Sequence, residues 1–271
     1  MIGVFDSGVG GLTVVKEIFK YLPGRKIIYF GDTARLPYGT KGKDFVKRYS
    51  ERISKWLLNK GARVIVVACN TSSAWAADSL KKKFKGVPIF EMIEPAVREV
   101  AKISEKTGLA NATKEVRVGV IGTPGTIRSG VYRQKLADYP NLRIYPAACP
   151  LFVPLAEDGL VRGPIAEQVA KKYLRPLKNK KIDVLILGCT HYPLLKETIA
   201  GIMGQKVKII NPAEALAKNL KEFLEKSSVL TEKTKKEKSH RFFFSDQPYN
   251  FKKISHLCFN KRIKIEVGDP F

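Results

Sequence analysis

Two cysteines lie in closely similar surroundings, one in each half of the chain. Cys69 follows the apolar run VIVVA at 64–68, and Cys189 follows the apolar run VLILG at 184–188. Such runs are typical of buried parallel strands, and open α/β sheets bind ligands just beyond the carboxyl ends of those strands. The pattern predicts that the two thiols face each other across one cleft. Chemistry with an acid and a base on opposite sides of a carbon atom needs this arrangement.

The position of these cysteines also predicts reactive thiols. Both precede a predicted helix or loop, where backbone N–H groups and the helix dipole lower the pKa of a thiol. An ordinary thiol has a pKa of about 8.5 and is mostly protonated at neutral pH. One thiolate and one thiol would form a base and an acid of matched strength. A disulfide between them is the alternative, which a cytosolic setting disfavours. Cys149 and Cys258 are expected to be buried structural residues.

His191 shares a turn with Cys189, which makes it a candidate for poising that thiol, although a lone histidine is more often structural. The other two histidines, His240 and His256, fall in the basic C-terminal region and are expected at the surface. A thiol hydrolase with Cys189 as nucleophile and His191 as base is an alternative. Two residues on one turn give that pair poor geometry, and the second cysteine is left unexplained.

Polar residues also end the first two predicted strands. Asp6 and Ser7 lead into a glycine-rich turn at 8–11, whose backbone amides can approach an anion at a helix N-terminus. Asp32 ends the second strand, near the place where Asp6 and Cys69 should converge, and its alternative role is a turn or helix cap. The glycine turn lacks the GxGxxG and GxxxxGK[ST] patterns, which argues against a nicotinamide or ATP site.

Loops supply further candidates. Tyr38 and Gly39 offer a hydroxyl group and backbone amides, and Thr123 lies in the turn of the second half that corresponds to the glycine turn of the first. Glu157 follows the segment of Cys149, where an acidic residue is either solvated or part of the site. No two cysteines lie within four residues of each other, so zinc-ribbon spacing is absent.

The cysteine motifs belong to a longer internal repeat. Apolar strands, the cysteines and the Pro-Ala pairs at 95–96 and 212–213 recur in the same order at offsets of 115 to 120 residues. The repeat predicts an α/β fold of two pseudo-symmetric lobes, each a mostly parallel sheet flanked by helices, with the active site in the cleft between them. Because the last predicted strand lacks a partner in the second half, we expect residues 1–93 plus 210–271 to form lobe one and residues 94–209 to form lobe two.

Periodicity and turn residues place the elements of each lobe. Strands are expected at 3–6, 26–31, 64–68, 88–90, 116–121, 142–146, 182–188 and 241–245. Helices are expected at 12–21, 44–59, 71–84, 95–104, 164–174 and 212–224. The polar stretch 226–241 is expected to be a surface loop.

Composition restricts the class of protein. The 271 residues are 44% hydrophobic, enough for a core in each lobe, and carry a net charge of +24. We find no signal peptide, no apolar run of about 18 residues and no secreted disulfide framework, so we expect a cytoplasmic protein without a membrane segment. The charge predicts either a solvated basic surface or a polyanionic partner such as nucleic acid, for which zinc fingers and ribonucleoprotein motifs are absent.

Six motifs together resemble those of the glutamate racemases, within the aspartate/glutamate racemase superfamily. They are DSGVGG at 6–11, GDTARLPYG at 31–39, ACNT at 68–71, GTPGT at 122–126, PLAE at 154–157 and GCTHYP at 188–193. The resemblance implies interconversion of L- and D-glutamate without cofactor or metal, supply of D-glutamate for peptidoglycan, and a homodimer. Some relatives have been linked to inhibition of DNA gyrase, which the high charge makes worth noting.

The resemblance also implies roles at the matching positions. Cys69 and Cys189 are the two acid–base thiols, and the resemblance alone assigns Cys69 to the D-enantiomer and Cys189 to the L-enantiomer. The residues implied to assist proton movement are Asp6, Asp32, Glu157 and His191. The residues implied to hold the substrate are Asp6, Ser7, Tyr38, Gly39, Asn70, Thr71, Thr123, Thr190 and His191. The remaining alternatives are an aspartate racemase and a basic nucleic-acid-binding protein with structural cysteines.

Overall fold

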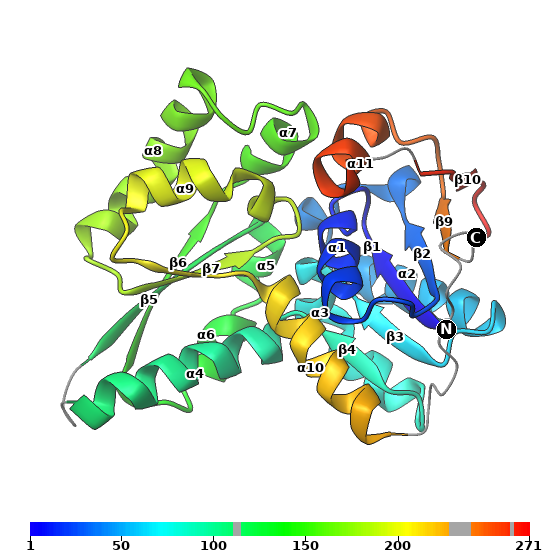
Figure 1. The fold of residues 1–271 in the computed structure, drawn as a ribbon, viewed down its shortest axis with the longest axis horizontal. Coiled ribbons are helices and arrows are strands. Elements are labelled where there is room, and N and C mark those ends of the chain that lie inside the picture. Colours follow the sequence, from blue (N-terminus) through cyan, green and yellow to red (C-terminus); the bar gives the residue numbers. More distant parts are fainter. Residues whose placement is uncertain (111–114, 228–239, 261–262) are drawn as a thin grey trace.

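Two parallel sheets, each covered by helices, form the core of the protein. The structure, a computed structural model, describes residues 1–110, 115–227, 240–260 and 263–271, and the side chains of these residues except 106–110. Figure 1 shows the two sheets side by side, the first with its N-terminal strands in blue and cyan and its C-terminal strands in orange and red, and the other in green and yellow. Every strand pair in both sheets is parallel.

The sheet of the first lobe has the strand order β10-β9-β2-β1-β3-β4. Its strands are β1 (Ile2–Asp6), β2 (Ile27–Gly31), β3 (Val64–Val67), β4 (Ile89–Glu91), β9 (Arg241–Phe244) and β10 (Glu266–Val267). β1 pairs with both β2 and β3, so the strand that ends in Asp6 lies beside the strand that leads to Cys69. β9 pairs with β2, so the C-terminal part of the chain extends this first sheet.

The sheet of the second lobe has the strand order β6-β5-β7-β8. Its strands are β5 (Val116–Gly122), β6 (Leu142–Ala148), β7 (Val184–Gly188) and β8 (Lys208–Ile210). This order repeats the segment β2-β1-β3-β4 of the first sheet, strand for strand. β7, which leads to Cys189, therefore takes the place in its sheet that β3 takes in the other. The predicted α/β fold of two similar lobes is confirmed, whereas the exact lobe boundaries stay a prediction.

Helices cover both faces of each sheet. Those packed on the first sheet are α1 (Leu12–Tyr21), α2 (Lys43–Asn59), α3 (Asn70–Lys83), α10 (Pro212–Lys226) and α11 (Phe251–Phe259). The second lobe contains α4 (Ile93–Ala110), α5 (Pro124–Arg128), α6 (Val131–Leu136), α7 (Phe152–Glu157), α8 (Pro164–Asn179) and α9 (Lys196–Met203). Short 3-10 helices lie at Thr33–Arg35, Tyr38–Thr40 and Tyr192–Leu195. Among the described helices, none has the length and apolar character needed to cross a membrane.

The strands are apolar because both faces of each sheet are buried. In β1, Val4 packs with residues of α1, α10 and α11, whereas its neighbour Phe5 packs with residues of α2 and α3. In β7, Ile186 packs with α4 and α6, whereas Leu187 packs with α8 and α9. Successive side chains of a strand point to opposite faces, so each central strand is held on both sides. This packing fixes the positions of the residues that follow β3 and β7.

The structure also contains elements that the sequence patterns did not predict. These are the short helices α5, α6, α7, α9 and α11 and the edge strands β8 and β10. α4 and α8 are longer than expected, and α8 continues past Pro176 to Asn179. Most of the polar stretch 226–241, which was expected to be a surface loop, lies outside the described residues.

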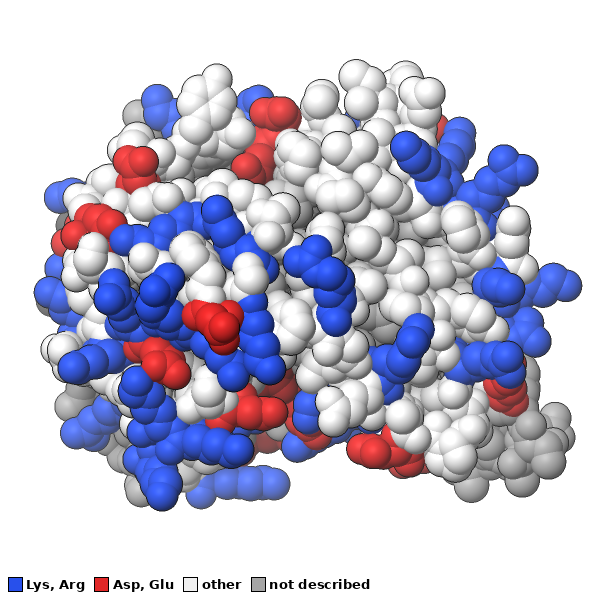
Figure 2. All heavy atoms as spheres, turned by 180° about the vertical axis from the view of Figure 1, so that it is seen from behind, with Lys and Arg blue, Asp and Glu red and all other residues white. Residues whose placement is uncertain are grey.

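Basic side chains cover much of the surface. Figure 2 shows lysine and arginine over both lobes with acidic residues among them, most densely over the first lobe, on the left. Several of these cations lie over aromatic rings of the chain itself; the guanidinium carbons of Arg48 and Arg52 are both 5.5 Å from the ring centre of Tyr49. A nucleic-acid partner or DNA gyrase stays a prediction.

Candidate active site

Residues that follow the carboxyl ends of β1, β2, β3, β5, β6 and β7 line one pocket between the lobes. The lining residues are Ser7, Gly8, Leu36, Pro37, Tyr38, Gly39, Cys69, Asn70, Thr71, Thr123, Val153, Glu157, Cys189, Thr190 and His191. Open α/β sheets bind ligands at such ends. All residues predicted for the site line this pocket except Asp6 and Asp32, which lie behind its wall.

Both candidate cysteines belong to the wall of this pocket, one from each lobe. Only Ala68 separates Cys69 from the end of β3, and Cys189 comes directly after β7. Their exposed fractions are 5% and 6%, and both are free thiols. Because the two strands are equivalent in their sheets, the fold delivers two equivalent thiols to one pocket. Cys149 and Cys258 are also free and buried, but they are not among the lining residues.

Cys69 is placed as a protonated thiol. Its sulfur caps the N-terminus of α3, accepting the backbone N–H of Ser72 at 3.5 Å, and it donates to the hydroxyl oxygen of Ser7 at 3.8 Å. Burial, together with the charge of Asp6, raises the pKa of Cys69 to about 12, and the N–H of Ser72 only partly opposes this. The expectation of a lowered pKa at this thiol is therefore wrong. Desolvation and a nearby carboxylate outweigh the helix N-terminus.

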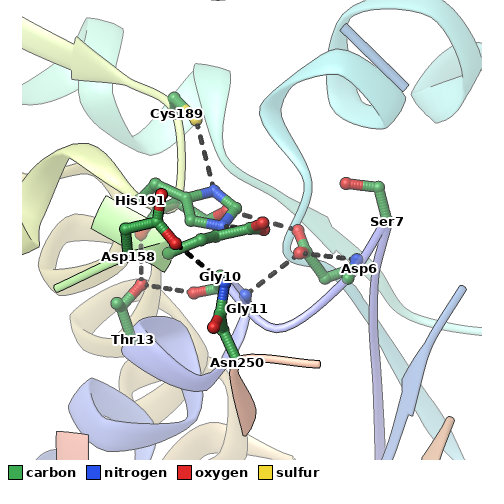
Figure 3. Close-up of polar contacts among 12 residues, drawn as sticks. Asp6, Ser7, Gly10, Gly11, Thr13, Asp158, Cys189, His191 and Asn250 are labelled. Atoms are coloured by element: carbon green, nitrogen blue, oxygen red, sulfur yellow. Dashed lines mark hydrogen bonds and ion pairs between the residues drawn. The ribbon is translucent and has the colours of Figure 1, made fainter. Parts of the chain in front are cut away.

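Cys189 has a different neighbour. Its Sγ atom lies 3.8 Å from Nδ1 of His191, and Nε2 of the same ring lies 3.0 Å from Oε1 of Glu157. Burial alone would lower the pKa of His191, but its hydrogen bonds to Cys189 and Glu157 raise it to about 10. The imidazole is thereby placed beside the sulfur atom, within reach of a proton exchanged between them. Figure 3 shows the ring of His191 beside Cys189, with the carboxylate of Asp6 nearby.

Asp6 lies behind the wall and holds two loops. Its carboxylate accepts the backbone N–H groups of Gly8 and Gly11 at 3.1 and 3.0 Å and the hydroxyl of Thr190 at 3.4 Å (Figure 3). Complete burial raises the pKa of Asp6, which the nearby charge of His191 opposes. These contacts tie the glycine turn of lobe one to the loop of Cys189 in lobe two.

Asp32 also lies behind the wall. Its Oδ2 atom accepts the hydroxyl of Tyr38 at 2.6 Å, and its Oδ1 atom accepts from Ser245 at 2.8 Å and from Arg35 at 2.7 Å. Both oxygen atoms are therefore occupied by protein donors. The contacts support a role in fixing Tyr38, which does line the pocket, and a direct part of Asp32 in proton movement stays a prediction.

The remaining predicted residues offer donors to a bound anion. Thr71 links the two lobes at the pocket, because its hydroxyl lies 2.9 Å from that of Thr123 and 3.1 Å from that of Thr126. Gly39 has no room for a side chain, since a Cβ atom there would lie 2.6 Å from Cβ of Thr123. Hydroxyl groups and closely approaching backbone amides suit the carboxylates of a small substrate.

Three contacts that complete the site had no clear signal in the sequence. The hydroxyl of Thr13 on α1 donates to the carbonyl oxygen of Thr190 at 2.8 Å (Figure 3). Lys253 on α11 donates to the carbonyl oxygen of Asp158, next to Glu157, at 2.9 Å. Tyr132 on α6 donates to Oδ1 of Asn70 at 3.0 Å. Each joins residues far apart in the chain, so only the tertiary fold reveals it.

The histidines outside the site differ from one another. His256 is exposed, as expected, whereas His240 is partly buried, and its Nδ1 atom accepts the backbone N–H of Ile27 at 3.2 Å. Within the described part of the chain, no group of three or more His, Cys, Asp or Glu residues is arranged to hold a metal ion.

Comparisons with known proteins agree with one another. The sequence model of a family described as Asp/Glu/Hydantoin racemase matches residues 2–220. The chain is 44% identical to the glutamate racemase of Geobacter metallireducens over 271 residues, which cover 100% of this chain and 95% of the relative. It is 43% identical to the glutamate racemase of Aquifex pyrophilus over 268 residues, covering 99% and 97% of the two chains.

Solved structures show the same similarity. A crystal structure of glutamate racemase from Francisella tularensis, in complex with D-glutamate, superposes with a TM-score of 0.86 at 39% identity and covers 98% of this chain and 96% of that one. The glutamate racemase isoform RacE1 from Bacillus anthracis gives a TM-score of 0.90 at 35% identity, covering 100% and 97%.

Proposed function

The chain belongs to the Asp/Glu/Hydantoin racemase family, and we propose that it is a glutamate racemase that uses Cys69 and Cys189 as its two acid–base groups without a cofactor. One observation carries the proposal: two thiols from equivalent strand ends of the two lobes line the same pocket. The relatives named glutamate racemase, and the one in complex with D-glutamate, support glutamate as the substrate.

The surroundings of the two thiols support an assignment of which thiol removes a proton and which donates one in the resting enzyme. Cys189, beside the imidazolium of His191, is suited to be the thiolate that removes the α-proton of glutamate. Cys69, whose pKa is raised to about 12, is suited to be the thiol that donates a proton to the opposite face of the same carbon. The carbon gains one proton and loses one, so its configuration inverts and the two thiols exchange protonation states.

The two thiols alone do not account for the rate. A general acid or base contributes roughly 10²–10⁴-fold. The carbanion must also be stabilised, which requires donors fixed where the negative charge develops. The hydroxyls of Ser7, Thr71 and Thr190 and the amide of Asn70 line the pocket and are suited to this task.

Deuterium incorporation tests the proposal. L-glutamate incubated with the enzyme in D₂O should become D-glutamate that carries deuterium at the α-carbon, with no bond other than C–H broken. Cys69→Ser and Cys189→Ser should each lower racemisation by at least about 10²-fold. Each should still eliminate a glutamate analogue that carries a leaving group next to the α-carbon, from one enantiomer only. Cys258→Ala, at a buried cysteine that does not line the pocket, is the matched control. Normal racemisation by both serine variants would overturn the proposal.

The absence of a cofactor has a separate test. The purified enzyme should keep its activity after dialysis against a chelator and should show no pyridoxal absorbance. Loss of activity on chelation would contradict the proposed mechanism. An amino-acid panel that includes aspartate separates a glutamate racemase from an aspartate racemase.

We further propose the setting that the resemblance implies: a cytoplasmic homodimer that supplies D-glutamate for peptidoglycan. Expression in a bacterial strain that requires D-glutamate should restore growth, and the Cys69→Ser variant should not. Sedimentation of the purified protein at micromolar concentration should give twice the 30.3 kDa mass of one chain.

A further inference from the structure

Tyr132 contacts the neighbours of both candidate cysteines, although it comes from neither cysteine loop. It lies on α6 of the second lobe and is 4% exposed. Its hydroxyl donates to Oδ1 of Asn70, the residue after Cys69, at 3.0 Å. Its ring reaches the other loop, because a Cβ atom built on Gly188, the residue before Cys189, would lie 3.4 Å from Cε2 of Tyr132.

The amide of Asn70 is only half satisfied. Its side chain is 2% exposed and lines the pocket, and its Nδ2 atom is buried without a hydrogen-bond partner. A buried donor without an acceptor costs about 1–3 kcal/mol. The pocket that Asn70 lines offers a place for an acceptor, which a bound ligand would supply.

The hydrogen bond from Tyr132 decides which end of this amide faces the ligand. An asparagine amide can turn over, since its oxygen and nitrogen have similar shapes. A buried phenol needs an acceptor for its O–H, and Oδ1 of Asn70 is that acceptor. The amide oxygen is thereby held toward Tyr132, and the donor Nδ2 remains free for the ligand.

We propose that Tyr132 is a positioning residue that fixes the amide of Asn70, so that Nδ2 donates to a carboxylate oxygen of the bound amino acid. The inference rests on the proposed racemase function and adds a residue to it. Because the bond joins α6 of one lobe to α3 of the other, this donor is correctly oriented only when the lobes are together. Tyr132 touches no reacting atom and acts through Asn70.

Tyr132→Phe tests the inference, because it removes the hydroxyl and keeps the packed ring. Without the bond the amide can turn over and present its oxygen to a carboxylate. We expect the KM for L-glutamate to rise about tenfold, the effect of losing one hydrogen bond to a charged group, with a smaller fall in kcat. Tyr21→Phe is the matched control, since the hydroxyl of Tyr21 bonds Glu214, which does not line the pocket, and its KM should not change.

A double-variant cycle separates positioning from simple structural support. If Tyr132 acts through Asn70, then Tyr132→Phe should raise KM in the wild-type background and have no further effect on KM in the Asn70→Ala background. Additive effects on KM would overturn the inference. Asn70→Asp provides a test that leaves the tyrosine intact, because its carboxylate still accepts from Tyr132 but offers no donor. Its KM should rise by tenfold or more, and an unchanged KM would also overturn the inference.

The same assays distinguish this inference from the proposed function. An active wild-type enzyme whose KM is unchanged in Tyr132→Phe contradicts only the role of Tyr132. Should the wild-type protein fail to racemise glutamate, the proposed function is wrong, and the affinity for D-glutamate measured by calorimetry replaces KM in the same comparison. A wild-type protein that binds no glutamate would overturn both.

Discussion

The Nδ1 atom of His191 lies 3.8 Å from the Sγ atom of Cys189, two residues earlier in the chain. In the first lobe, the residue two places after Cys69 is Thr71, which bonds other threonines across the pocket. The internal repeat therefore supplies two equivalent thiols with different neighbours. The two thiols therefore meet different side chains before any substrate binds.

Glu157→Gln tests the coupling between this carboxylate and Cys189. The glutamine keeps the shape but loses the charge that raises the pKa of His191, so the imidazolium should lose its proton at lower pH than in the wild type. We expect kcat/KM at pH 8 to fall about tenfold, the effect of losing one charge-assisted hydrogen bond. The alkaline limb of the pH profile between pH 6 and 10 should move to lower pH.

Two controls accompany this variant. Glu197→Gln removes an ion pair with Arg162 in which both side chains are about 70% exposed, and it should leave the profile unchanged. L- and D-glutamate have equal free energies in water, so Glu157→Gln must lower kcat/KM equally in both directions. A pH profile identical to that of the wild type would show that Glu157 does not act on the site.

The stability of the fold should also depend on the protonation of His191. Its pKa is raised from an ordinary value of about 6.5 to about 10, so the folded state keeps a proton that the unfolded state loses. The contribution to stability is fully present below about pH 6.5 and is lost as the pH rises through about 10. Urea midpoints of the wild type should therefore fall more steeply between pH 6.5 and 10 than those of His191→Gln. The other ionisable residues are the same in both proteins, so parallel curves would contradict this role of His191.

Asp32→Asn should reach the pocket through Tyr38. The carboxylate accepts from Tyr38, Ser245 and Arg35, and an asparagine would present an N–H group to one of these donors. We expect a loss of about 1–3 kcal/mol in the free energy of unfolding and a higher KM, because Tyr38 lines the pocket. Thermal unfolding and steady-state kinetics measure the two effects. A stability loss with an unchanged KM would limit Asp32 to a structural role.

The local residue pattern predicted the strands, and the internal repeat predicted that the two lobes are similar. The apolar strands ending in Cys69 and Cys189 lie where the pattern placed them, and the repeated motif order corresponds to the repeated strand order of the two sheets. The predicted residues around the pocket follow the same strand ends, because parallel strands bring their carboxyl ends to one edge of a sheet.

The features that the sequence patterns did not predict depend on tertiary packing. α8 continues past Pro176 because Leu174 and Leu177, on either side of it, are both buried in the core of the second lobe. The raised pKa of Cys69 depends on burial and on the distance to Asp6, and neither can be read from the residues that flank the cysteine. The same is true of Tyr132, whose partner Asn70 is 62 residues away.

Thr13→Val tests a bond that joins the lobes behind the pocket. The hydroxyl of Thr13 shares its one proton between the carbonyl oxygen of Thr190, next to Cys189, at 2.8 Å and that of Gly10 at 2.9 Å, and valine has the same shape without the donor. A buried carbonyl without its partner costs about 1–3 kcal/mol, so the free energy of unfolding should fall by that amount and kcat should fall with it. Thr13→Ser keeps the hydroxyl and should restore both values. Equal kcat in the valine and serine variants would show that this bond does not affect the site.

Gly10→Ala should displace His191 without touching either cysteine. A Cβ atom at Gly10 would lie 2.5 Å from Cε1 of His191 and 2.5 Å from Oγ1 of Thr190, so the ring must leave its present position beside Cys189. A displacement of about 1 Å in catalytic geometry can lower kcat about 10²-fold, and overpacking costs about 1–3 kcal/mol of stability. Gly42→Ala is the matched control, because a Cβ atom there meets nothing within 4 Å, and its activity should equal that of the wild type. If Gly10→Ala also kept the wild-type kcat and pH profile, the position of the imidazole would be irrelevant to catalysis, and the assignment of Cys189 as the resting thiolate would lose its basis.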